Sequence, residues 1–197
     1  WGLIKLSIKT KQVKHNVNEP GEKNTHSKNN IISVTEDSKK NLWIATIRGL
    51  NRLDPVKVNG KSYFVDDENE DVFGPNFIHD VQLDNEDNVW VALTNGQGLC
   101  RLNDASGKFE QYQSAYIVNF LFKDSEGKLW VWTNDGLFYY DSDKKVYVRL
   151  KDLNSLYEII SVSNIIENVN KNLLFRKVSG IIKINAKRNE TKHFGTK

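Results

Sequence analysis

A short sequence phrase recurs along this chain at a spacing of roughly 40 to 50 residues, and it constrains the fold more than any single residue does. Each copy joins an apolar run to a second apolar run through a turn that contains glycine. The copies cover residues 41–54, 89–103, 129–141 and, in degenerate form, 172–185. Trp43, Trp90 and Trp130 hold the same position in three copies, 47 and 40 residues apart, and Leu174 replaces them in the fourth. Self-similarity of this length indicates a tandem array, as in solenoids and propellers.

Residue types within one period distinguish a propeller blade from a pair of helices. Four short runs rich in β-branched, aromatic and aliphatic residues alternate with turn-forming clusters. In the first full repeat these runs are residues 31–35, 42–46, 50–53 and 63–65. No window keeps the apolar spacing of a good helix. The sequence therefore predicts an all-β chain made of four-stranded β-propeller blades.

The repeat also extends towards the start of the chain, because Gly2–Ser7 aligns with Gly49–Asp54. The chain is therefore expected to open in the middle of a blade, with the third and fourth strands present. We predict an arc of about four four-stranded blades plus a half blade, as part of a larger, seven-bladed propeller. The predicted divisions are a half blade with linker at 1–28, blades at 29–75, 76–115 and 116–157, and a degenerate blade at 158–197.

When the repeats are aligned, the residues that recur at equivalent positions have a structural interpretation. A set of equivalent positions is called a column. The three repeat tryptophans are expected to fill the wedge between neighbouring blades, since a large aromatic side chain buries about 150–250 Å². An aspartate begins the preceding turn in the same three copies, where its side chain can bond nearby backbone amides. A basic residue recurs after the glycine at Lys5, Arg52, Arg101 and Lys183, but Tyr139 replaces it in one copy. The long basic stems are expected to cover apolar surface.

The pattern in residues 32–37, 41–46 and 49–54 closely resembles the two-component regulator propeller repeat. That resemblance extends over nearly the whole chain. It implies the periplasmic sensor domain of a Bacteroidetes hybrid two-component system protein, in which blades form seven-bladed propellers. It further implies that an oligosaccharide cue is relayed through a homodimer to a histidine kinase and a transcriptional response. Adjacent propeller blades are the other expected partners.

Composition excludes several other classes of function. The net charge of +3 arises from 28 basic and 25 acidic residues that are scattered among the turns, so a nucleic-acid-binding surface is not expected. No run of 18 apolar residues is present to cross a membrane. Cys100 is the one cysteine in the sequence and is expected to be a small buried residue.

Catalysis and metal binding have no motif in their favour. The four histidines are widely separated and lack ligand spacing, and His79 alone is placed where it can face a propeller channel. The run 84–88 superficially resembles a calcium loop but lacks the glycine and the distal glutamate that such loops need. We predict no cofactor, no metal and no enzymatic activity for this segment.

Departures from the repeat are the best candidates for function, because a consistent array is broken where another demand is made on it. Trp132 stands where other copies have alanine, and aromatic rings beside amide and carboxylate groups are typical of sugar-binding surfaces. The candidate ligand-binding residues are Trp132, Asn134, Asp135, Tyr139, Arg48, Gln97 and His79. The structural alternative is that Trp132 fills a gap in the core. A structural or protein-interaction propeller without its own ligand site, and less so a propeller lyase, remain alternative functions.

Overall fold

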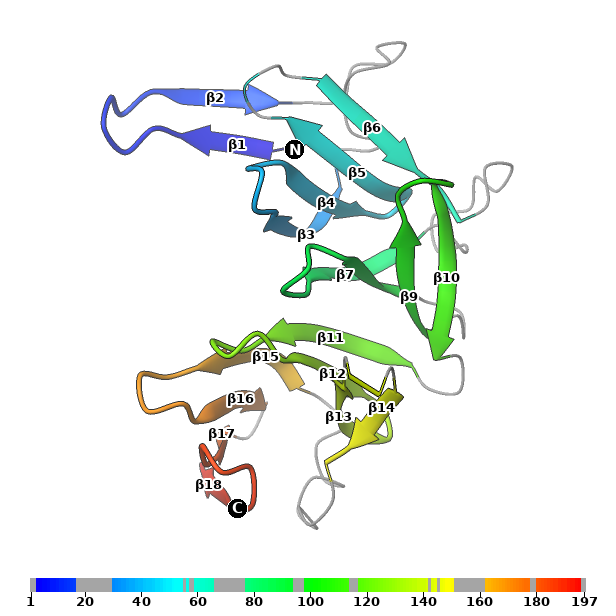
Figure 1. The fold of residues 1–197 in the computed structure, drawn as a ribbon. Coiled ribbons are helices and arrows are strands. Elements are labelled where there is room, and N and C mark those ends of the chain that lie inside the picture. The colour runs from blue at the N-terminus through cyan, green and yellow to red at the C-terminus, as the bar shows by residue number, and fades with distance from the viewer. Residues whose placement is uncertain are drawn as a thin grey trace. The chain divides into compact units, whose positions relative to one another are not determined.

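The computed structural model describes residues 3–16, 30–54, 56, 59–65, 77–93, 98–113, 117–141, 143–144, 146–150, 162–177 and 180–195. Every regular element in these ranges is a β-strand, which confirms the all-β prediction (Figure 1). No helix of the described ranges is long and apolar enough to cross a membrane.

In the part of the chain that the structure describes, the strands form one hairpin and four antiparallel four-stranded sheets, each in sequence order. The hairpin pairs β1 (Leu3–Leu6) with β2 (Val13–Asn16). The first sheet contains β3 (Ile31–Glu36), β4 (Leu42–Thr46), β5 (Gly49–Asp54) and β6 (Asn59–Tyr63). The second contains β7 (Ile78–Leu83), β8 (Val89–Leu93), β9 (Gly98–Asn103) and β10 (Lys108–Gln113).

The other two sheets repeat the same order. The third contains β11 (Val118–Lys123), β12 (Leu129–Thr133), β13 (Gly136–Asp141) and β14 (Val146–Arg149). The fourth contains β15 (Val162–Glu167), β16 (Leu173–Lys177), β17 (Gly180–Ile184) and β18 (Thr191–Phe194). Because strands that follow one another in sequence are paired, every sheet is a simple meander, as in a propeller blade.

The chain divides into two compact units, Trp1–Ile117 and Val118–Lys197. In the first unit, the β3–β6 sheet packs on the β7–β10 sheet, and the two sheets use non-equivalent faces for this contact. Trp43, Ala45 and Leu50 lie on the first of these faces, and Val81 and Val91 lie on the second. Alternation of side chains along each strand supplies both faces, so each sheet can pack on a neighbour at either side.

The second unit uses the same two faces. Trp130, Trp132 and Leu137 of the β11–β14 sheet form one core cluster with Phe175 and Ile182 of the β15–β18 sheet. Trp43 and Trp130 are therefore buried where sheets pack together, as the sequence predicts, and Trp90 is also buried. Cys100 is also buried, and burial raises the pKa of its thiol to about 11.

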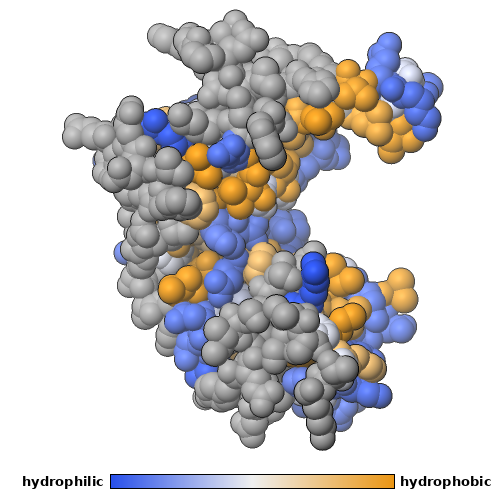
Figure 2. Space-filling view, turned by 180° about the vertical axis from the view of Figure 1, so that it is seen from behind, coloured by the Kyte–Doolittle hydropathy of each residue, from blue (hydrophilic) through white to orange (hydrophobic). Residues whose placement is uncertain are grey.

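Several exposed apolar side chains lie in the first hairpin and in the fourth sheet. The β1–β2 hairpin, at the upper right of Figure 2, exposes Ile4, Leu6 and Val13. In the fourth sheet, Ile166, Ile181 and Phe194 are also exposed. Of these residues, Ile4, Leu6 and Ile181 occupy positions that are mostly buried in the other sheets.

Candidate functional site

A hydrogen-bonded aspartate and tryptophan close one end of three of the four sheets. The indole Nε1 donates to the aspartate Oδ2, at 3.1 Å for Trp43 and Asp37. The same bond measures 2.9 Å between Trp90 and Asp84, and 2.8 Å between Trp130 and Asp124. We name this contact the Asp–Trp clasp. The sequence predicts the aspartate's role in the turn, but it did not reveal the bond to the indole, whose only signal is a constant separation of six residues.

The carboxylate of the clasp also holds the turn itself. Asp37 Oδ1 accepts a hydrogen bond from the backbone N–H of Asn41 at 2.8 Å, and Oδ2 accepts one from the Asn41 side chain at 2.9 Å. Burial alone would raise the pKa of Asp37, but the hydrogen bonds from Asn41 and Trp43 outweigh it and lower this pKa below its ordinary value of 3.8. The clasp is therefore strongest when the carboxylate is ionised.

This shift predicts a loss of stability in acid. A carboxyl whose pKa is lower in the folded state stabilises fully above its unfolded pKa, and the stabilisation is lost as pH falls through the folded value. Urea unfolding between about pH 5 and pH 2 is expected to show a flatter pH dependence for Asp37→Asn than for the unchanged chain. An identical pH dependence in both proteins would contradict the role assigned to this carboxylate.

The turns at the other end of the sheets carry three of the predicted ligand-binding residues, Arg48, Asn134 and Asp135. In the β12–β13 turn, Thr133 Oγ1 donates to Gly136 O and accepts from Asp135 N, both at 3.1 Å. Thr46 makes the same pair of bonds to Gly49 O and from Arg48 N, at 2.9 and 3.1 Å. The threonine thus gives both turns one conformation.

Gly49 has a φ of 114°, and a Cβ atom there would lie 2.6 Å from the backbone oxygen of Tyr63. Glycine is therefore required by both backbone conformation and space in the β4–β5 turn.

An arginine that the sequence did not single out completes the β12–β13 turn. Arg149, at the end of β14, donates from Nη2 to the Asp135 backbone oxygen at 2.6 Å, and its Nη1 lies 3.5 Å from Asp135 Oδ2. Both side chains are about one-third exposed, and Asn134 beside them is exposed. An amide, a carboxylate and a guanidinium therefore stand together at this edge, where they can donate to and accept from a polar ligand.

Trp132 and Tyr139 do not belong to that exposed group. Trp132 is 1% exposed, and its ring centroid lies 5.4 Å from that of Phe175. Tyr139 packs on Trp130 with ring centroids 5.5 Å apart, and the Lys128 ammonium lies 4.5 Å from the Tyr139 ring. The buried Trp132 ring has no face open for stacking on a sugar, and its position matches the core-filling alternative.

The remaining candidates lie in the first unit. Arg48 is partly buried in the β4–β5 turn. His79, near the start of β7, is partly buried and lies edge-on to Phe77, with ring centroids 6.3 Å apart. Gln97 lies outside the described residues. Within the described ranges, no group of three or more His, Cys, Asp or Glu side chains is arranged to hold a metal ion.

One part of the sequence matches a protein family directly. Residues 26–48 match the family model described as Two component regulator propeller. No curated protein matches the chain.

Solved structures share the fold at low sequence identity. The extracellular domain of the hybrid two component system BT3049 from B. thetaiotaomicron superposes with a TM-score of 0.76 and 17% identity, over 100% of this chain and 26% of that one. For BT4673 from the same organism the TM-score is 0.72 and the identity 19%, over 95% and 27% of the two chains. Virginiamycin B lyase from Staphylococcus aureus gives a TM-score of 0.69 and 16% identity, over 98% and 62%.

These matches confirm the β-propeller fold class, and the chain spans about a quarter of the length of the two hybrid-system domains. Together with its four meander sheets, this identifies the chain as a run of propeller blades that carries a two component regulator propeller repeat at residues 26–48.

Proposed function

We propose that this chain is part of the extracytoplasmic, ligand-sensing propeller of a hybrid two-component system sensor. The observation that carries the proposal is the two component regulator propeller repeat at residues 26–48, set in a fold shared with extracellular domains of two such systems. In this proposal the segment itself is not catalytic. It lies in the periplasm, and the parent protein relays the signal to a histidine kinase and a transcriptional response.

We further propose an oligosaccharide as the cue. Support comes from the family resemblance and from the polar group at the β12–β13 turn, where Asn134, Asp135 and Arg149 combine both donors and acceptors. Sugar hydroxyls need such mixed groups to fix their orientation. Because Trp132 is buried, the contribution of this turn is hydrogen bonding without aromatic stacking.

Titration calorimetry of the complete ectodomain against an oligosaccharide panel tests this proposal. For any glycan that binds, the double change Asn134→Ala and Asp135→Ala is expected to weaken binding by about tenfold or more, since each lost hydrogen bond to a ligand contributes about 0.5–1.5 kcal/mol. Glu126→Ala is a matched control, because Glu126 is exposed in the β11–β12 turn at the opposite end of the same sheet. No binding to any glycan, or equal weakening by both variants, would contradict the proposed site.

Neighbouring blades and a second copy of the sensor are the proposed protein partners. In the fourth sheet, Ile181 is 46% exposed, whereas its repeat equivalents Leu50, Leu99 and Leu137 are at most 1% exposed. Phe194, which pairs with Ile181, is also exposed, and so is Ile166 elsewhere on the same face. The proposed occupant of this face is a further blade, because the equivalent face of the β3–β6 sheet is covered by the next four-stranded sheet.

A lyase is the second candidate, favoured by the fold shared with virginiamycin B lyase and by His79 near the start of β7. Turnover of virginiamycin B that disappears in His79→Ala would support it. Glycan binding without turnover would favour the sensor.

A further inference from the structure

The fourth sheet lacks the Asp–Trp clasp. Asn168 and Leu174 stand in the positions held elsewhere by the aspartate and the tryptophan. Asn168 Oδ1 still accepts from the backbone N–H groups of Asn170 and Asn172, each at 3.0 Å, so the turn keeps its form. The carboxylate and the indole, however, are both gone. A different contact joins this end of the sheet to its neighbour.

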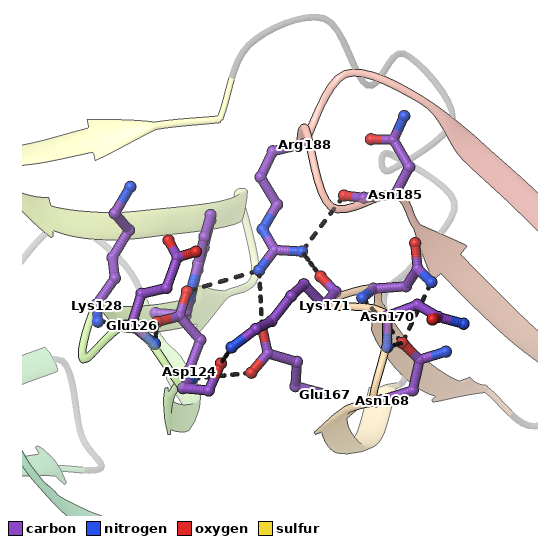
Figure 3. A network of polar contacts seen from close by, with 12 residues as sticks. Asp124, Glu126, Lys128, Glu167, Asn168, Asn170, Lys171, Asn185 and Arg188 are labelled. Atoms are coloured by element: carbon purple, nitrogen blue, oxygen red, sulfur yellow. Dashed lines mark hydrogen bonds and ion pairs between the residues drawn. The ribbon is translucent and has the colours of Figure 1, made fainter.

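Arg188, in the turn between β17 and β18, reaches the neighbouring sheet at this place (Figure 3). Its Nη2 lies 3.6 Å from Asp124 Oδ2 of the third sheet and 3.4 Å from Glu167 Oε1 of its own sheet. The guanidinium carbon lies 5.3 Å from the centre of the Trp130 ring. One side chain therefore contacts both members of the neighbouring clasp.

The backbone around Arg188 presents this side chain in a fixed direction. Its Nη1 donates to the backbone oxygen of Lys171 at 2.6 Å and to that of Asn185 at 3.3 Å. Arg188 has a φ of 61°, a left-handed conformation that few residues other than glycine adopt. Lys40 and Lys171 adopt the same conformation in other turns, so the backbone alone does not select the residue type at this position.

The two carboxylates are held in place independently of Arg188. Asp124 Oδ2 accepts from Trp130 Nε1 at 2.8 Å, and Glu167 Oε2 accepts from the backbone N–H of Ser125 at 2.8 Å. The side chains of Arg188, Asp124 and Glu167 are only 15%, 2% and 9% exposed. Removal of the guanidinium would leave two largely buried carboxylates without their shared cation, which is strongly unfavourable.

Other charged groups surround the contact without replacing it. Lys128 lies with its ammonium 5.8 Å from the centre of the Trp130 ring, and Lys171 hydrogen-bonds the Ser125 hydroxyl. Burial alone would raise the pKa of Glu167, but hydrogen bonds from Ser125, with smaller effects of Lys171 and Arg188, lower it. A lysine is a point charge and lacks the planar fork that lets Arg188 contact two carboxylates and a ring at once.

We propose that Arg188 fastens the β15–β18 sheet to the β11–β14 sheet by contacting Asp124 and Trp130, in place of the clasp that the fourth sheet lacks. We name this contact of Arg188 the latch. The consequence is a junction held by a buried charge contact. When the latch is removed, the fourth sheet opens locally while the rest of the chain stays folded.

The first unit supplies a matched control. Arg52 also lies over a clasp tryptophan, 5.7 Å from the centre of the Trp43 ring, and also pairs with a carboxylate of the neighbouring sheet, 3.5 Å from Asp104 Oδ2. Its side chain is 36% exposed and that of Asp104 is 57% exposed. The chemistry is the same, but solvent screens it, so its loss is expected to matter little.

Hydrogen–deuterium exchange of the 197-residue chain, read by mass spectrometry, tests the latch. In Arg188→Met, amides of β16 and β17 are expected to exchange about tenfold to a hundredfold faster, with the first unit unchanged. In Arg52→Met, exchange of β4 and β5 is expected to change by less than about twofold. Unchanged exchange in Arg188→Met, or acceleration spread evenly over the second unit, would overturn the proposal.

If the Arg188→Met variant does not fold, the Arg188→Lys variant tests the proposed contact instead. Faster exchange in β16 and β17 than in the unchanged chain supports the latch, because a lysine keeps the charge and loses the fork. Exchange identical to that of the unchanged chain overturns it.

Discussion

Replacement of Trp132 by alanine is expected to lower the free energy of unfolding by about 3–5 kcal/mol, the usual cost of truncating a buried aromatic side chain. The ring is 1% exposed and packs on Phe175 of the neighbouring sheet, so its removal leaves a cavity between the two sheets of the second unit. Urea denaturation, with the slope compared between variants, measures this loss. It would be among the largest effects of any single substitution in the chain.

The matched variant Trp132→Phe separates packing from recognition. A phenyl ring fills part of the space, so a smaller loss of about 1–2 kcal/mol is expected. Where the ectodomain binds a glycan, both variants are expected to keep that binding as long as they remain folded. Loss of glycan binding with little loss of stability would show that Trp132 contacts the ligand after all.

Leu50→Ala is expected to cost about 2–5 kcal/mol, whereas Ile181→Ala at the equivalent repeat position is expected to cost at most about 1 kcal/mol. Leu50 is fully buried by the β7–β10 sheet, and Ile181 is 46% exposed. Thermal or urea unfolding of the 197-residue chain compares the two directly. The pair controls for sequence position in the blade, because both residues occupy the same repeat position and differ mainly in whether a sheet covers them.

The same pair tests the proposed occupant of the fourth sheet's open face. If that face receives a further blade in the parent protein, Ile181→Ala is expected to become as costly there as Leu50→Ala is here. Equal costs in the isolated chain would contradict the burial difference on which this expectation rests.

The repeat allowed the β-propeller fold to be predicted because its signals are local. Alternation of apolar residues, a glycine before each third strand and turn residues before each second strand depend on neighbours a few positions away. Gly49 illustrates this: its positive φ and the close approach of Tyr63 follow from the turn that the sequence already indicated. The burial of Trp43, Trp90 and Trp130 followed from the same periodicity.

The candidate site was predicted less completely, because exposure and pairing depend on segments distant in sequence. Trp132 is buried by Phe175, which lies in the next sheet. Asp135 is paired with Arg149 from the end of the fourth strand, and nothing in the repeat pattern singled out that arginine. The basic column was expected to cover apolar surface, and the structure adds that Arg52 and Arg101 lie over the clasp tryptophans.

The sequence by itself determined that this chain forms four-stranded sheets in a repeating order, since each strand and turn is specified by residues close to it. Only the tertiary structure decided which departures from the repeat face solvent and which fill the core. Arg188 shows the reason most clearly: its partners Asp124 and Trp130 lie more than 50 residues away in the neighbouring sheet, and the contact exists only once the two sheets have packed.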